Sequence, residues 1–286
     1  MRRILLALYR VRGALYGVTA LILVAIAFTS GISLGDGARQ ARSIVAVISV
    51  GVLAVCVLLV FIGPRLIPTR EAVAISAPVS GRWLSVNSPA TKVPSHGIRL
   101  YGQAYAIDLV HEPDDTARPS FGSGSAMRPA REYPAFGEPV FAMIDGVVVR
   151  ATDWRRDHRA RSSGLAIAYM LIEGAVRELG GPGFILGNHV TIRGANGDFA
   201  TVAHLEQGSV AVKVGETVRA GTRIARCGNS GNSSEPHVHA QLMDRASPWT
   251  AQGLPMLFVD VVLDEGGPLA ALPGTGQHMI AAVARG

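Results

Sequence analysis

The sequence predicts a mainly β fold, an antiparallel β-sandwich or open barrel with a helical insertion, preceded by two transmembrane helices. Short β-rich runs separated by glycine turns fill residues 187–242, and this pattern is typical of antiparallel architectures. Two long apolar segments occupy the N-terminal quarter of the chain. A chain of 286 residues has room for one ordinary domain plus accessory segments.

The clearest strands lie in the second half of the chain. Residues 190–193 and 199–204 are expected to form a hairpin, because Asn196-Gly197 between two β-rich runs is a strong turn signal. Residues 210–214 and 222–227 are predicted as further short strands, each followed or preceded by a glycine turn. Adjacent strands of this kind present side chains on one open face.

The apolar segments at residues 15–34 and 44–62 contain no charged residue, and each has about the 20 residues needed to span a bilayer. The first run is longer than the apolar part of a signal peptide, and a second run follows it. We therefore expect a retained, two-span membrane anchor that contacts lipid, rather than a cleaved leader.

The distribution of arginine bears on the orientation of this anchor. Four arginines precede the first span, whereas two lie between the spans and two follow the second. This bias favours a cytoplasmic N-terminus and, with two spans, a cytoplasmic C-terminal domain. The alternatives are an external N-terminus, with Arg39 and Arg42 holding the short loop inside, or a single true span.

The predicted organisation has four parts: a membrane anchor at residues 1–66, a linker and first strand at 67–94, the β-domain at 95–265 and a tail at 266–286. Two insertions interrupt the β-domain. Residues 112–139 have the composition of a long surface loop, and apolar residues at helical spacing predict a helix over Ser163–Leu179. Loops that flank a site in this way commonly wall a substrate groove.

A pair of histidines, His237 and His239, carries the strongest chemical signal. Alternate side chains of a strand share a face, so both imidazoles can point into one cleft. Two imidazoles from one strand suit a borderline metal such as zinc. Two unrelated histidines on a half-exposed strand are the alternative.

Several further motifs accompany this pair in a fixed order. They are Tyr105–Asp108, Pro139–Ala142, Asp145–Val148, Gly187–Val190, Ala203–Leu205, Val214–Val218 and Gly228–His239. Together they resemble the lysostaphin/LytM-type zinc metallopeptidases, which cut peptide cross-links in bacterial cell walls. The resemblance covers roughly residues 95–245.

The resemblance implies three zinc ligands: a histidine, an aspartate four residues later, and the second histidine of the pair. Asp108 and His239 match the second and third of these, but Ala104 stands where the first histidine is expected. A relative with this Gln-x-Tyr-Ala-x-Asp version of the motif carries an earlier histidine, which makes His96 the favoured first ligand.

Two other histidines remain open as the first ligand. His111 lies three residues after Asp108, which in a continuing strand points to the opposite face. His189 opens a neighbouring strand, at a position that family members often fill with a residue that binds no metal.

The resemblance implies a zinc metalloendopeptidase, with one Zn²⁺ per chain, that hydrolyses peptidoglycan peptides through a zinc-activated water, and the two apolar segments add a membrane anchor. His204 and His237 match its two non-ligand histidines, which would orient this water and stabilise the oxyanion. Because the wall lies outside the cell, we expect a multi-pass protein of the cytoplasmic membrane with an extracytoplasmic peptidase domain, against the arginine bias.

Two alternatives belong to other functional classes. The missing histidine at Ala104 favours a catalytically inactive LytM-like module that regulates other wall hydrolases. Residues 214–225 also resemble a lipoyl- or biotinyl-carrier hairpin, but no suitable lysine stands at its tip.

The net charge of +6 comes mostly from arginine, and no nucleic-acid-binding motif accompanies it. Five arginines cluster around Trp154 and His158, where they form either a solvated basic loop or a contact for anionic wall polymers or lipid headgroups. Cys56 and Cys227 lie in different predicted parts of the chain and are not expected to form a disulfide.

Overall fold

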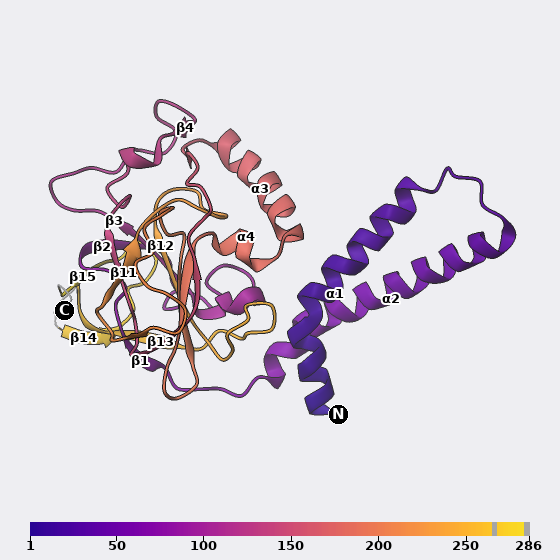
Figure 1. Ribbon diagram of the computed structural model, residues 1–286, viewed down its shortest axis with the longest axis horizontal. Coiled ribbons are helices and arrows are strands. Elements are labelled where there is room, and N and C mark those ends of the chain that lie inside the picture. The colour runs from indigo at the N-terminus through magenta and orange to yellow at the C-terminus, as the bar shows by residue number, and fades with distance from the viewer. Residues whose placement is uncertain (265–267, 283–286) are drawn as a thin grey trace. The chain divides into compact units, whose positions relative to one another are not determined.

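The computed structural model describes residues 1–264 and 268–282, and the chain divides into two compact units, residues 1–70 and 71–286. In the first unit, α1 (Arg2–Phe28) and α2 (Asp36–Leu66) form a helical hairpin (Figure 1). Both helices are long and apolar enough to cross a membrane. The first helix ends earlier than the predicted segment, because Ser30 and Gly31 form a turn after Phe28.

Close contact between α1 and α2 depends on a glycine. A Cβ atom added at Gly63 would overlap the ring of Tyr9, so a larger side chain there would force the helices apart. Small residues at helix contacts are typical of membrane helix pairs.

The second unit is built on one large sheet, in the order β1-β13-β15-β2-β3-β12-β9-β8-β6-β10, with β14 paired to β13. Its pairings are antiparallel except for the parallel pair β1–β13. The strands are β1 (Val73–Ser76), β2 (Gly81–Asn87), β3 (Ile107–His111), β6 (Gly146–Thr152), β8 (His189–Arg193), β9 (Phe199–Ala203), β10 (Thr217–Val218), β12 (Val238–Met243), β13 (Met256–Leu263), β14 (Pro268–Ala271) and β15 (His278–Ala281). The predicted mainly antiparallel fold is confirmed.

Smaller elements complete the unit. Two further pairs join β5 (Pro139–Phe141) to β11 (Arg223–Arg226) and β4 (Met127–Arg128) to β7 (Ala160–Arg161). The helical elements are η1 (Leu100–Tyr105), η2 (Ala130–Glu132), α3 (Gly164–Leu179) and α4 (Pro182–Leu186). The core includes the fully buried side chains of Trp83, Ile107, Leu242 and Phe258.

The predicted hairpin is confirmed as β8 and β9, and the predicted strand at 222–227 as β11. The predicted strand at residues 210–214 is wrong. In this segment Ala211 N donates to Ile224 O, Lys213 O accepts from Glu216 N, and the chain then turns at Gly215, where φ is 92°. Val212 is buried, but Val214 is 64% exposed, and this segment forms no strand ladder within the described residues.

The predicted helical insertion is confirmed as α3, and the Ser163 side chain accepts a hydrogen bond from Ala166 N as its N-cap. Its burial differs from the usual amphipathic pattern. Ala166 and Gly174 are its buried residues, whereas Leu165 and Ile172 are exposed. The apolar periodicity therefore predicted the helix, but much of its apolar surface faces solvent.

The division into a linker and first strand at residues 67–94, a β-domain at 95–265 and a tail at 266–286 remains a prediction. The structure pairs β2 with both β15 and β3, so residues on either side of the predicted boundaries lie in the same sheet. β13 likewise pairs with β1, β14 and β15. This arrangement places the N-terminal and C-terminal strands of the unit side by side, next to the strand β3 that carries Asp108.

Candidate metal centre

Strand pairing in the middle of the sheet brings three of the predicted site residues to one place. β12 lies between β3 and β9, and its register sets His239 opposite Asp108 on one side and Ala203 on the other. His204 follows Ala203 directly at the end of β9. In β12 the apolar residues Val238, Ala240 and Leu242 alternate with His239 and Gln241, and alternation of this kind specifies on which face of the sheet each side chain lies.

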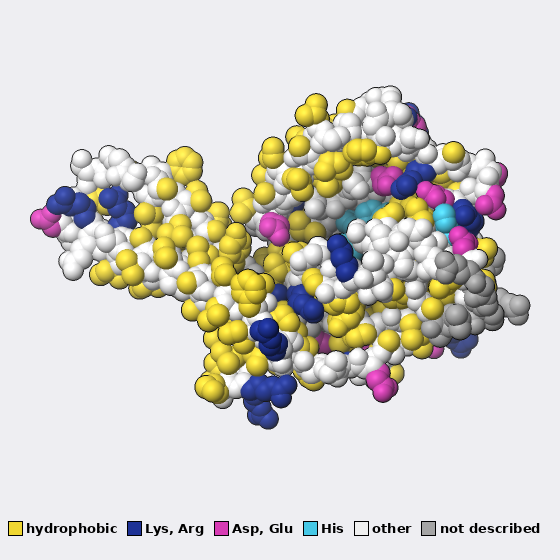
Figure 2. Space-filling model, turned by 180° about the vertical axis from the view of Figure 1, so that it is seen from behind, with side chains coloured by type: hydrophobic (Ala, Val, Ile, Leu, Met, Phe, Trp, Pro, Cys, Tyr) yellow, Lys and Arg dark blue, Asp and Glu magenta, His cyan; other side chains and the backbone are white. Residues whose placement is uncertain are grey.

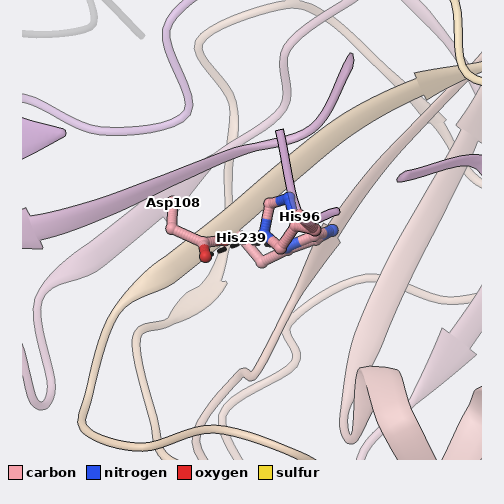
Figure 3. A group of neighbouring side chains, drawn as sticks. All are labelled: His96, Asp108 and His239. Atoms are coloured by element: carbon pink, nitrogen blue, oxygen red, sulfur yellow. Dashed lines mark hydrogen bonds and ion pairs between the residues drawn. The ribbon is translucent and has the colours of Figure 1, made fainter. Parts of the chain in front are cut away.

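His96 reaches the same place from the loop before η1. Its Nε2 lies 2.8 Å from Asp108 Oδ2. Figure 3 shows His96, Asp108 and His239 close together. The loop is fixed by Ser95, whose amide donates to Ala104 O and whose hydroxyl donates to Ala106 O at 2.6 Å. The chain thus folds back so that His96 starts next to Ala104, the position where the family pattern expects a histidine.

His96, Asp108 and His239 offer ligand atoms that all lie within 4.8 Å of one another. His239 Nδ1 is 2.8 Å from Asp108 Oδ1. Two imidazoles and one carboxylate form a donor set that zinc accepts in catalytic sites, where three protein ligands leave a position open. The chemistry of these residues therefore fits a zinc ion.

Each of the three side chains also contacts a further polar side chain at hydrogen-bond distance. Ser95 Oγ is 2.9 Å from His96 Nδ1, and Gln241 Oε1 is 2.9 Å from His239 Nε2. Asn87 Nδ2 donates to Asp108 Oδ2 at 2.8 Å. Such contacts orient metal ligands and fix the imidazole tautomer, so His96 would bind through Nε2 and His239 through Nδ1.

The carboxylate is the electrostatic centre of the cluster. Burial raises the pKa of Asp108, but the neighbouring His96 and His237 and the hydrogen bonds from His239 and His96 outweigh this effect. The pKa of Asp108 is therefore held well below its usual value, and the group is ionised as a metal ligand must be.

His204 and His237 lie beside the cluster with their rings 4.7 Å apart. His204 Nδ1 donates to Ser230 O at 2.8 Å, and His237 Nδ1 donates to Glu235 O at 2.8 Å. Because a carbonyl oxygen only accepts hydrogen bonds, each Nδ1 carries a proton and each Nε2 is left to interact with a ligand.

The backbone at His204 is unusual, since φ is 62° in a residue other than glycine. Such conformations concentrate at functional sites, where the surrounding structure holds them in place. His204 N donates to Leu186 O, and His204 O accepts from Gly228 N. Burial, followed by the neighbouring His237 and His239, lowers the pKa of His204 well below 6.5, so its imidazole is neutral.

The other two candidate ligands lie elsewhere. The ring of His111 packs 4.8 Å from that of Trp83, with Nδ1 3.4 Å from Pro134 O. His189 is buried, its Nδ1 donates to Gly187 O at 2.9 Å, and burial lowers its pKa to about 4. Neither belongs to the donor group found among residues 1–264 and 268–282.

A groove of about 490 Å³ opens above the cluster, and Figure 2 shows histidine side chains at the bottom of a hollow in this surface. One wall consists of α3 and α4, through Leu171, Gly174 and Ile185 among others, and the facing wall includes Ile98 and Tyr101. The predicted helical insertion therefore does line the groove over the candidate site.

Asn87, Ser95 and Gln241 were not predicted from the sequence. Gln241 carries a signal that could have found it, because it lies two residues after His239 and so shares its face of β12. Asn87 and Ser95 reach the cluster through the β2–β3 pairing and the folded loop, which no local pattern reveals.

Comparison with known proteins connects this geometry to a family. Residues 166–250 match the model of peptidase family M23, and this segment contains most of α3, all of α4, His204, His237 and His239, whereas His96 and Asp108 lie before it.

Solved structures of this type are similar to the chain at low identity. The catalytic domain of lysostaphin from Staphylococcus simulans is 19% identical over 61% of this chain and 88% of that one, with a TM-score of 0.32. The catalytic domain of the M23 protein EnpA from Enterococcus faecalis, as a point mutant, is 21% identical over 51% and 92%, with a TM-score of 0.26.

A LytM protein from Ruminococcus gnavus is 16% identical over 52% of this chain, with a TM-score of 0.29, and the match spans only 42% of that protein. The resemblance that the sequence motifs predict is thus confirmed through the family model, which matches residues 166–250.

Proposed function

We propose that this protein is a membrane-anchored zinc metalloendopeptidase that hydrolyses peptide cross-links of bacterial peptidoglycan. The observation that carries the proposal is the convergence of His96, Asp108 and His239 at the bottom of the groove. The M23 match over residues 166–250 supports a peptidase. The two apolar helices support an anchor that contacts membrane lipid.

The proposed roles follow from the orientation of each side chain. His96, Asp108 and His239 would hold one zinc ion, which when bound supplies a Lewis acid that polarises a carbonyl and lowers the pKa of a water to about 7. His204, neutral and with Nε2 unprotonated, would accept a proton. His237 Nε2 lies 3.6 Å from Asp108 Oδ1, and with both ring nitrogens protonated His237 would donate a hydrogen bond from Nε2 to the oxyanion.

A catalytically inactive module that regulates other wall hydrolases is the second candidate. Ala104, in place of the expected first histidine, favours it. Against it, His96 lies within hydrogen-bond distance of Asp108 and would replace the missing ligand. The two candidates differ in whether the chain binds zinc and cleaves peptide bonds.

Metal content separates these candidates. The full chain, purified in detergent, is expected to contain close to one zinc per chain by elemental analysis, since it offers one three-residue donor group within the described residues. The same preparation should release peptides from purified peptidoglycan, lose this activity with a chelator, and regain it with added zinc. Absence of zinc after reconstitution, or bound zinc without any peptide cleavage, would favour the inactive module.

The proposed substrate sets the orientation in the membrane. Residues 71–286 are expected outside the cytoplasmic membrane, where peptidoglycan lies, although the arginine bias opposes this. Arg39 and Arg42, at the start of α2, would keep the loop between α1 and α2 on the cytoplasmic side of the membrane. Alkaline phosphatase fused after Arg70 should be active, and green fluorescent protein at the same position dark. The reverse pattern would remove peptidoglycan as the substrate.

A further inference from the structure

A second pocket, of about 460 Å³, lies on the other side of α3 from the groove, and five of its lining residues are arginine. The residues of α3 show this division. Tyr169, Glu173 and Arg177, spaced four apart, line the arginine pocket, whereas Gly174 and Glu178 line the groove. The arginines of the pocket are Arg155, Arg156, Arg159, Arg161 and Arg177.

The negative charge around this pocket is smaller than the positive charge. Glu173 pairs with both Arg161, at 2.5 Å, and Arg177, at 3.6 Å. Asp157, the other acidic residue of the lining, accepts hydrogen bonds from the backbone amides of Gln207 and Asn229. Five guanidinium groups therefore face two carboxylates, and one of these carboxylates is occupied by main-chain donors.

Several guanidinium donors in the pocket lack an acceptor. Arg155 Nε, Arg161 Nε and Arg177 Nη1 are buried and have no hydrogen-bond partner within residues 1–264 and 268–282. The Arg161 side chain is only 4% exposed. A buried, charged donor without an acceptor costs free energy, and native proteins generally satisfy such groups. Because these atoms are shielded from solvent, they show how tightly the positive charges are gathered, and the excess of arginine over acidic residues in the lining is what indicates an anionic ligand.

The arginines are held in place without that ligand. The guanidinium of Arg155 lies 3.7 Å from the ring centroid of Phe184 and 4.3 Å from that of Trp154. Stacking of this kind fixes the plane of the guanidinium and leaves its edge free for hydrogen bonds. Burial, and then the neighbouring Arg177, lowers the pKa of Arg155, as expected where positive charges are gathered without enough counter-charge.

We propose that this pocket is a binding site for a phosphate group carried by a larger molecule. A tetrahedral phosphate accepts hydrogen bonds from several guanidinium forks in different planes, whereas a planar carboxylate is satisfied by one fork. The volume exceeds what a single phosphate ion fills and lies within the range of small-molecule sites, so the ligand is an organic phosphate monoester or diester.

Two sources supply this chemistry: the phosphodiester of a soluble or wall-linked polymer, and the headgroup of an anionic phospholipid. In either case the ligand would be held across α3 from the candidate metal centre, because α3 separates the two cavities. The site is independent of the proposed peptidase activity, since no member of the metal cluster lines it.

Calorimetric titration of the full chain in nonionic detergent with glycerol 3-phosphate tests the proposal. Saturable binding at one site per chain is expected, and Arg155→Gln and Arg177→Gln should each weaken it by about tenfold or more, since each removes charge-assisted hydrogen bonds. Arg219→Gln is the matched control, because it removes the same charge from an exposed position outside the pocket and should leave the affinity unchanged.

Absence of binding by the unmodified chain, or an equal loss in all three variants, would overturn the proposal. Circular dichroism checks folding, and if Arg177→Gln is unfolded, Arg155→Gln decides the result, since Arg155 makes no ion pair within the described residues. Repeating the titration in phosphatidylcholine nanodiscs with and without phosphatidylglycerol separates the sources. Competition by phosphatidylglycerol supports the lipid headgroup as the ligand, and unchanged affinity supports the polymer.

Discussion

Asp108→Ala is expected to abolish zinc binding and peptidoglycan hydrolysis together. Asp108 lies 2.8 Å from both His96 Nε2 and His239 Nδ1, so it is the residue that links the other two ligands. Loss of a residue that merely orients a ligand costs roughly 10–100-fold in metal affinity or activity, and loss of a ligand costs more. Titration against a chromogenic zinc chelator measures the affinity, and the rate of peptide release measures the activity.

His96→Ala and His239→Ala are expected to give the same result, whereas His111→Ala should keep its zinc. His111 is the matched control because it is also a histidine near Asp108 in the sequence, but its ring packs against Trp83. If His96→Ala instead retains full zinc occupancy and activity, the assignment of the loop histidine is wrong. The variants of His111 and His189 would then identify the third ligand.

The sequence predicted the parts of the site that depend on strand geometry. His237 and His239 share a local pattern, and Asn196-Gly197 fixes the β8–β9 hairpin whose end carries His204. Hydrophobic alternation then sets the register of β12 against its neighbours, which places His239 opposite Asp108. Each of these steps uses a two-residue period or a turn signal, so each is visible in the sequence.

Other features could not be derived from local patterns. The placement of His96 depends on the contact between Ser95 and Ala104 and on left-handed backbone at Tyr101 and Gly102, none of which has a periodic signature. The sequence also did not predict which face of α3 is buried. Its apolar spacing predicts a helix, but the buried side is decided by small residues such as Gly174, which lies close to Asn232.

Variants of the two histidines beside the cluster should separate catalysis from metal binding. His204→Ala and His237→Ala are each expected to keep one zinc per chain and to lower the rate of hydrolysis by about 10²–10⁴-fold, the usual contribution of a general acid or base. The reason is their geometry: both anchor Nδ1 on a backbone carbonyl and direct Nε2 away from it. Loss of zinc in either variant would contradict this prediction and would indicate that the substituted histidine binds the metal.

The positive φ of His204 requires a further variant, because alanine tolerates this backbone poorly. His204→Ala is expected to lower the free energy of unfolding through the backbone by only a fraction of the roughly 1–2 kcal/mol that left-handed backbone costs, because histidine already bears most of that cost. His204→Asn should lose less, since asparagine occurs more readily in the left-handed region. Both variants should nevertheless lose hydrolysis to a similar extent. Activity that recovers in His204→Asn would show that the backbone conformation, and not the imidazole, is what hydrolysis requires.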